Sequence, residues 1–149
     1  MYHFIINPVS RSGRGKQIWS ELEPYLKKKK IPYKAHISNE PGKIVEIVSE
    51  LTSNFSEDYI KLIVLGGDGT MNEALQGVAD FTHTYIAYIP TGSSNDLARD
   101  LKITGEPIEI LKQILRAKKP VAIDMGVLTY NSMNKERSRL HNKHIKNTR

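Results

Sequence analysis

Two short turns hold most of the side chains in this chain that could do chemistry. The first covers residues 66–70 and has the sequence Gly-Gly-Asp-Gly-Thr, directly after an apolar run. A glycine-rich turn that leads from a strand into a helix directs backbone N–H groups at a small space, which suits a phosphate group. Asp68 would repel a bare phosphate but can hold a metal ion or a hydroxyl group. The turn therefore predicts a nucleotide-phosphate site that uses a cation. The alternative is a tight turn with a capping Thr70.

The second turn covers residues 90–96, with the sequence Pro-Thr-Gly-Ser-Ser-Asn-Asp, and it also leads into a helical pattern. Ser93 or Ser94 can cap that helix, and the free N–H groups of the helix favour an anion. Taken alone, the turn also fits a purely capping role. If the strands that precede the two turns are neighbours in a sheet, both turns border one crevice.

Three further features are weaker candidates. Residues 8–16 form a polar, basic loop at the position where the first strand–helix turn of a nucleotide-binding α/β fold binds phosphate. The loop does not fit the Walker A pattern, so an ordinary solvent-exposed loop is an equal alternative. Ser38 follows a strand-like run and is expected to cap the next helix. Asp124 lies in an otherwise apolar run, where a carboxylate must be paired, metal-bound or at an edge. Structural and active-site roles are both open for it.

The elements that must position these residues alternate between strand and helix. Residues 60–65 are dense in aliphatic side chains, which is typical of a strand buried on both faces of a parallel sheet. Strands are expected at residues 2–7, 33–37, 60–65, 85–89 and 121–128. Helices are expected at residues 16–26, 44–54, 71–78 and 107–118, from the spacing of their apolar side chains. The alternation predicts an α/β fold with a mostly parallel sheet.

Composition and charge limit the class of protein. The 149 residues fit one domain, 39% of them are hydrophobic, and there is no cysteine for a disulfide or a thiolate site. No apolar run approaches the roughly 20 residues of a membrane-spanning helix, so we expect a cytoplasmic protein. Residues 135–149 contain six Lys or Arg and one Glu, which gives them +5 of the total net charge of +6. We expect this basic end either to be disordered or to contact an anionic membrane. It has no interleaved aromatic residues, so nucleic acid binding is not expected.

Together, the two turns resemble those of the diacylglycerol kinase catalytic-domain family, and most of all its bacterial soluble lipid kinases. The run Asn7-Pro8-Val9-Ser10 is similar to the first nucleotide loop of the family, and residues 121–126 are similar to the strand that leads toward its second domain. The resemblance covers roughly residues 2–130. NAD kinases and phosphofructokinases have turns like the first one, and the second turn is what points to lipid kinases. The resemblance implies a three-layer, Rossmann-like α/β domain.

The resemblance also implies an activity, which is ATP-dependent, Mg²⁺-assisted phosphorylation of a lipid hydroxyl such as that of diacylglycerol. It implies that ATP contacts Asn7, Pro8, Val9, Ser10, Arg11, Ser38, Gly67, Asp68, Gly69, Thr70, Met71, Asn72, Glu73, Ser93 and Asn95. Asp68 would act through Mg²⁺ or orient phosphate. Asn95, Asp96 and Asp124 would form a polar network beneath the transferred group. Phosphoryl transfer needs mainly positioning and charge neutralisation, which such loops can supply. One departure is Arg11, where family members commonly have glycine.

A larger departure lies at the end of the chain. Family members have a second, β-rich domain that supplies the catalytic base, further metal-linked acidic residues and much of the lipid site, and nothing after Asn131 resembles it. We expect an ATP-binding domain at residues 1–130 and a basic tail at 131–149, in a shortened chain or one half of a split enzyme. The two hypotheses are an ATP-binding half of a lipid kinase and a vestigial nucleotide-binding domain without catalysis. The strand expected at 121–128 would leave an open edge that promotes a homodimer.

Overall fold

The computed structural model describes residues 1–53 and 59–127. The chain divides into two compact units, Met1–Lys118 and Lys119–Arg149. The first unit contains all the helices and strands of the described residues.

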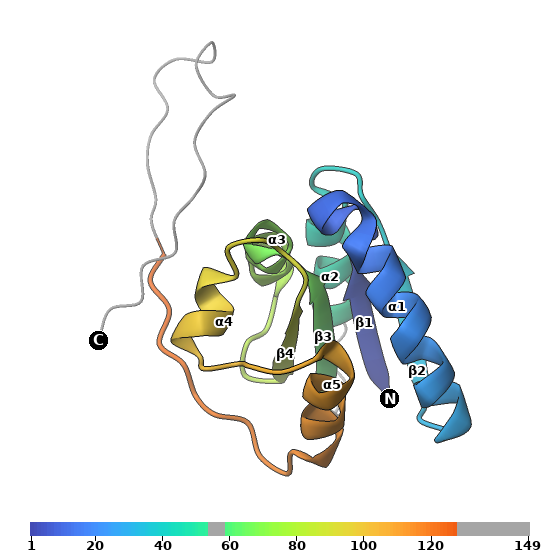
Figure 1. Ribbon diagram of the computed structural model, residues 1–149. Helices are drawn as coiled ribbons and strands as arrows, with labels where there is room; N and C mark the ends of the chain where they lie inside the picture. Colours follow the sequence, from blue (N-terminus) through green and yellow to red (C-terminus); the bar gives the residue numbers. More distant parts are fainter. Residues whose placement is uncertain (54–58, 128–149) are drawn as a thin grey trace. The chain divides into compact units, whose positions relative to one another are not determined.

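A parallel sheet forms the middle of the first unit (Figure 1). Its strands are β1 (Tyr2–Ile6), β2 (Tyr33–Ile37), β3 (Ile60–Gly66) and β4 (Thr84–Pro90). The strand order is β2-β1-β3-β4, and every pairing is parallel. In the register, Ile6 lies opposite both Ile37 and Leu65, and Gly66 lies opposite Pro90. The carboxyl ends of all four strands therefore meet at one edge of the sheet. The predicted α/β fold with a parallel sheet is confirmed.

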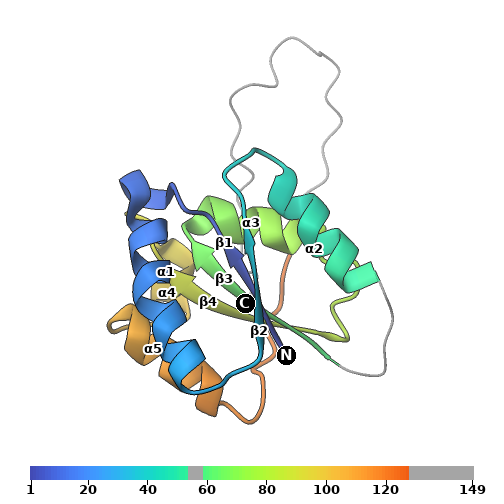
Figure 2. The same ribbon diagram turned by 90° about the vertical axis from the view of Figure 1, so that its right-hand side faces the viewer.

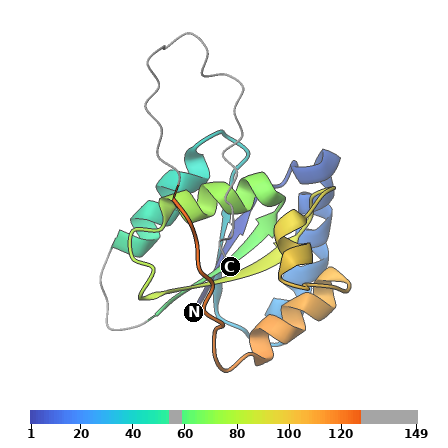
Figure 3. The same cartoon turned by 90° about the vertical axis from the view of Figure 1, so that its left-hand side faces the viewer.

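Helices cover both faces of this sheet. They are α1 (Ser10–Lys28), α2 (Lys43–Ser53), α3 (Asp68–Gly77), α4 (Asp96–Asp100) and α5 (Pro107–Arg116). Figure 2 shows α1 and α5 on one side of the sheet and α2 and α3 on the other, and Figure 3 shows the same layers from the opposite direction. Among the described residues, no helix combines the length and the apolar character needed to cross a membrane.

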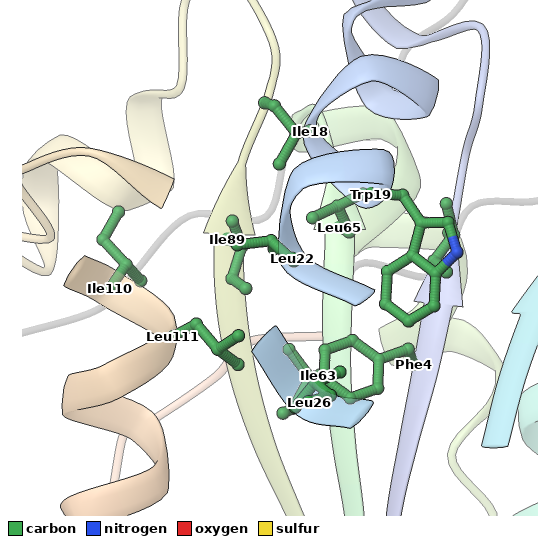
Figure 4. Packing of buried hydrophobic residues seen from close by; sticks show 11 residues of the cluster. Phe4, Ile18, Trp19, Leu22, Leu26, Ile63, Leu65, Ile89, Ile110 and Leu111 are labelled. Carbon is green, nitrogen blue, oxygen red and sulfur yellow. The ribbon is translucent and has the colours of Figure 1, made fainter. Parts of the chain in front are cut away.

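Alternation of side chains along the strands produces one apolar cluster on each face of the sheet. On the first face, side chains of α1 and α5 point into a shared core with those of the sheet (Figure 4): Phe4, Ile6, Ile18, Trp19, Leu22, Leu26, Ile63, Leu65, Ile89, Ile110 and Leu111. On the second face, α2, α3 and α4 contribute to a cluster of Ile5, Ile44, Val48, Leu62, Val64, Met71, Ala74, Val78, Tyr88 and Ala98. Because β1 and β3 are buried on both faces, the loops that leave their carboxyl ends start from a rigid base.

Two helices begin earlier than the apolar spacing predicted. Helix α3 begins at Asp68, so the glycine-rich turn supplies the first turn of the helix and not only a connecting loop. Helix α1 spans from Ser10, but Arg11, Ser12 and Gly13 inside that span are left-handed, with φ of 46°, 55° and 94°. The loop closes on itself because the Gly13 N–H donates to the Val9 carbonyl at 3.3 Å. The α1 segment after this loop is a regular helix.

The second unit departs from the sequence-based prediction. Lys119–Val127 contains neither helix nor strand, so the strand expected at 121–128 is wrong over its described part. A strand forms when a neighbour pairs with its backbone N–H and C=O groups, and residues 121–127 are paired with none. The open strand edge that suggested a homodimer is therefore not formed. Leu128, the predicted tail at 131–149 and Asn54 at the predicted end of a helix lie outside the described residues.

Candidate functional site

The strand order places a switch point between β1 and β3. The chain leaves β1 to form β2 on one side, and β3 then adds on the other side of β1. In open parallel sheets, ligands bind at such a point, outside the carboxyl ends of the two strands. Asn7 directly follows β1, and Thr70 lies in the first turn of α3, which follows β3. The Asn7 side-chain N–H donates to the Thr70 hydroxyl at 3.1 Å and joins the two loops at this point.

The two turns singled out in the sequence lie side by side, because β3 and β4 are neighbours. The Thr91 N–H donates to the Gly66 carbonyl at 2.8 Å. Gly67 and Gly92 bring their backbones together: a Cβ atom on Gly92 would lie only 3.0 Å from the Gly67 Cα atom. Gly92 is not left-handed, so space and not backbone conformation requires a glycine here. The turns therefore form one continuous wall.

Asp68 links the first turn to α4. One of its carboxylate oxygens accepts the Asp96 N–H at 2.9 Å, and the other faces the Leu97 N–H at 3.4 Å. These amides belong to the first turn of α4, whose N-cap residue is Asn95, with φ of 49°. The prediction that Ser93 or Ser94 caps this helix is wrong, because the Asp68 carboxylate takes over that role from the neighbouring turn. Sequence reasoning missed this contact, which joins residues 28 or more positions apart.

The basic loop after β1 packs against the second turn. The Ser10 and Thr91 hydroxyl groups lie 2.6 Å apart, and the Ser10 hydroxyl also donates to the Asn7 carbonyl at 3.0 Å. Gly15 lies so close to the Asn7 carbonyl that a Cβ atom would clash with it. The three loops that follow β1, β3 and β4 are thus in mutual contact at one edge of the sheet.

A pocket of about 330 Å³ opens beside the second turn. It is bounded by the start of α1, the turn itself, α4 and the beginning of α5. Arg11, Arg14 and Arg99 line it, together with the single acidic side chain of Glu106. The Arg99 guanidinium donates to the Ser94 carbonyl at 2.9 Å, which fixes it against the turn. Arg99 is also paired with Asp96, 3.1 Å away, whereas Arg11 and Arg14 have no ion pair within the described residues. The positive charge of these two side chains favours an anionic ligand. Arg14 and Arg99 had not been singled out from the sequence; the basic character of residues 8–16 was the only signal for Arg14, and Arg99 had none.

Three buried side-chain atoms have no hydrogen-bond partner within the described part of the chain: Glu73 Oε2, the Tyr88 hydroxyl and Asn95 Oδ1. A buried polar atom without a partner costs free energy, so such atoms call for an explanation. Burial, and then the nearby Asp68 carboxylate, raise the pKa of Tyr88. The Tyr88 hydroxyl is therefore protonated at neutral pH.

The other candidate residues are distributed as follows. Five of them lie in the contacting loops or in the first turns of α3 and are partly or fully exposed: Pro8, Val9, Gly69, Asn72 and Ser93. Met71 is only 4% exposed and packs in the second core cluster, so its side chain faces away from the crevice.

Ser38 lies beside the end of β1, because its backbone N–H donates to the Ile6 carbonyl at 3.0 Å, but no described side-chain contact joins it to the two glycine turns. The Ser38 hydroxyl follows β2 and accepts the Glu40 N–H at 3.2 Å. The sequence predicts that Ser38 caps α2, and this prediction is wrong. Ser38 forms a local turn instead, because α2 begins only at Lys43. Asp124 belongs to the second unit and is not paired with any described group.

No group of three or more His, Cys, Asp or Glu side chains that could hold a metal ion occurs in residues 1–53 and 59–127. Mg²⁺ is commonly bound by one or two carboxylates together with the phosphates of a nucleotide. Asp68 fits that mode, because each of its two carboxylate oxygens has a second lone pair that no backbone amide uses.

Fold and site define a parallel α/β domain whose candidate ligand site lies at the carboxyl ends of β1, β3 and β4. The chain belongs to the diacylglycerol kinase catalytic domain family, whose model matches residues 1–128. It is 31% identical over 121 residues to "Putative lipid kinase YtlR" of Bacillus subtilis, covering 80% of this chain and 38% of that protein. It is 32% identical over 125 residues to a diacylglycerol kinase of Staphylococcus carnosus, covering 82% of this chain and 39% of that protein.

A solved structure agrees with this family membership. A diacylglycerol kinase from Bacillus anthracis matches with a TM-score of 0.66 and 27% identity, over 83% of this chain and 42% of that chain. The chain therefore spans about two fifths of the length of the relatives it matches. The match places the predicted fold class among known structures.

Proposed function

We propose that this chain is the nucleotide-binding domain of a kinase that transfers the γ-phosphoryl group of ATP to the hydroxyl group of a lipid, diacylglycerol or a close relative. The observation that carries the proposal is the contact of three loops at the switch point, where Asp68 joins the two glycine turns. Such a site offers backbone N–H groups, one carboxylate and a basic pocket within a single crevice. These are the groups that hold a nucleotide with its phosphates and its cation.

The phosphates of ATP would lie over the first turn of α3 and the basic loop after β1. The positive end of the α3 dipole and the free N–H groups of its first turn favour negative charge there. Arg11 and Arg14 would neutralise further phosphate charge from the side of the pocket. Asn7 and Thr70 would fix the spacing between the two loops, since their side chains already bond across the switch point.

Asp68 would hold Mg²⁺ together with phosphate oxygens of the bound nucleotide. When bound, Mg²⁺ supplies the positive charge that offsets the charge of the phosphoryl group during transfer. The residues of this chain orient the nucleotide: Asp68 is anchored by the amides of α4, and Glu73 and Asn95 offer buried acceptor atoms close to the turns.

We assign the other groups that the reaction needs to the portion of the relatives that this chain does not span. We place the catalytic base and most of the lipid site there. We assign residues 1–130 to nucleotide binding, and the basic residues 135–149 to contact with an anionic membrane. Asp124 and Ser38 remain candidates for roles in the complete site.

Isothermal titration calorimetry with ATP and Mg²⁺ tests the proposal. Wild-type chain is expected to bind, and Asp68→Ala is expected to weaken binding at least tenfold. Glu109→Ala is the control, because it also removes one carboxylate but lies on the exposed side of α5, paired with Lys112. Absence of nucleotide binding by the wild type would refute the proposal. Equal binding by the Asp68 and Glu109 variants would refute the role of Asp68.

A further inference from the structure

Thr91 connects the sheet to the basic loop after β1. It directly follows β4 and is only 1% exposed. Its backbone N–H donates to the Gly66 carbonyl at 2.8 Å and so continues the pairing of β3 and β4 by one bond. Its hydroxyl lies 2.6 Å from the hydroxyl of Ser10, and we call these two groups the hydroxyl pair. The backbone of Thr91 is thus part of a rigid base, and its side chain reaches the loop.

The direction of the bond in the hydroxyl pair follows from the other partner of Ser10. A serine hydroxyl has one hydrogen, and that of Ser10 is donated to the Asn7 carbonyl at 3.0 Å. A carbonyl oxygen can only accept, so the hydrogen within the pair must come from Thr91. The Asn7 side chain in turn donates to the Thr70 hydroxyl at 3.1 Å. A chain of hydrogen bonds therefore runs from the β4 turn, through the loop after β1, to the first turn of α3.

The loop needs such an anchor because its backbone is strained. Arg11 and Ser12 are both left-handed, with φ of 46° and 55°, a conformation that is costly for residues other than glycine. Within the loop, the Gly13 N–H closes the turn with a bond of 3.3 Å to the Val9 carbonyl. Strained backbone persists only where the surrounding structure holds it. The hydroxyl pair supplies a bond from outside the loop, directly before the two left-handed residues.

We propose that Thr91 is a positioning residue of the nucleotide site: its hydroxyl holds the loop after β1 so that Arg11 and Arg14 face the polyphosphate, and it thereby sets the preference of the site for ATP over AMP. This inference rests on the proposed function, since it concerns the same site. Arg11 and Arg14 line the pocket, and neither has an ion pair within the described residues. Their charges are available to a chain of phosphates as long as the loop keeps its place.

The variant Thr91→Val removes the hydroxyl and keeps the branched side chain, whereas Thr91→Ser keeps the hydroxyl. Thr84→Val is the matched control: Thr84 begins the same strand at the opposite edge of the sheet, is 7% exposed, and donates its hydroxyl to the Asp80 carbonyl at 2.6 Å. In the nucleotide-free chain, Thr91→Val is expected to speed hydrogen exchange of the Gly13 N–H about fivefold, the value of one hydrogen bond. Thr91→Ser and Thr84→Val should exchange at the wild-type rate. Unchanged exchange in Thr91→Val would overturn the inference.

Calorimetry with ATP and Mg²⁺, and separately with AMP, gives the second arm. Thr91→Val is expected to weaken ATP binding about fivefold and AMP binding by less than about twofold, since AMP lacks the polyphosphate. Thr91→Ser and Thr84→Val should keep the wild-type ratio of the two affinities. Equal losses for ATP and AMP in Thr91→Val would indicate a merely structural role and overturn the inference. Failure of the wild type to bind ATP would instead refute the proposed function and the nucleotide preference with it, while exchange of the Gly13 N–H would still decide whether Thr91 holds the loop.

Discussion

The contact between Gly67 and Gly92 offers a direct test of how the two turns form one wall. We consider Gly92→Ala. The added methyl group would lie 3.0 Å from the Gly67 Cα atom and 2.9 Å from Asn95 Oδ1. The Asn95 side chain can rotate away, but the Gly67 backbone belongs to the junction of β3 and α3 and cannot move without shifting both. Overpacking of this kind typically costs about 1–3 kcal/mol.

The matched control is Gly69→Ala, which adds the same methyl group two residues beyond Gly67. Nothing lies within 4 Å of a Cβ atom on Gly69, and the residue is inside α3. Alanine there is expected to stabilise the helix by about 0.5–1 kcal/mol. Thermal unfolding followed by circular dichroism should therefore separate the variants, with Gly92→Ala lowering the midpoint by roughly 4 °C or more and Gly69→Ala raising it. A Gly92→Ala chain as stable as wild type would refute the close contact of the turns.

Two further predictions concern stability. Arg11 is left-handed, with φ of 46°, a conformation that costs a non-glycine residue about 1–2 kcal/mol. In urea titrations, Arg11→Gly should therefore raise the free energy of unfolding by about 0.5–1 kcal/mol. A loss of stability in this variant would contradict the left-handed conformation of Arg11. His3 and His36 stack with their ring nitrogens 3.1 Å apart, and burial, with the neighbouring positive groups, lowers the pKa of both. Because the folded state then prefers neutral imidazole rings, the free energy of unfolding should be at its full value above about pH 6.5. It should fall as the pH drops through the folded-state pKa values of the two histidines. An unfolding midpoint that stays flat between pH 7 and 5, relative to that of His36→Gln, would argue against this pH dependence.

Much of the fold followed from short-range patterns in the sequence. The aliphatic run at 60–65 predicted a doubly buried strand, and β3 is one. The two glycine turns were expected to share one crevice if their strands were neighbours, and β3 and β4 are paired. These features depend on residues that are close together in the chain. The spacing of their apolar side chains and the positions of their glycines can be recognised in the sequence without a structure.

Contacts between distant segments could not be predicted in the same way. The bond from Asp68 to the amides of α4 depends on how two turns approach, and no spacing rule encodes that approach. The run at 121–127 has strand-like side chains, but a strand also requires a partner, which the sequence pattern does not supply. The left-handed conformation of Arg11 and Ser12 could not be predicted either, because neither residue type favours it.

The central claim is that the loops after β1, β3 and β4 bind one nucleotide. Amide NMR signals recorded while ATP and Mg²⁺ are added to the chain test it most directly. We predict that signals from residues 7–15, 66–72 and 91–97 shift together, with one dissociation constant, while signals from the amino ends of the strands stay in place. Shifts confined to other parts of the chain, or no shifts at saturating ATP, would contradict the claim.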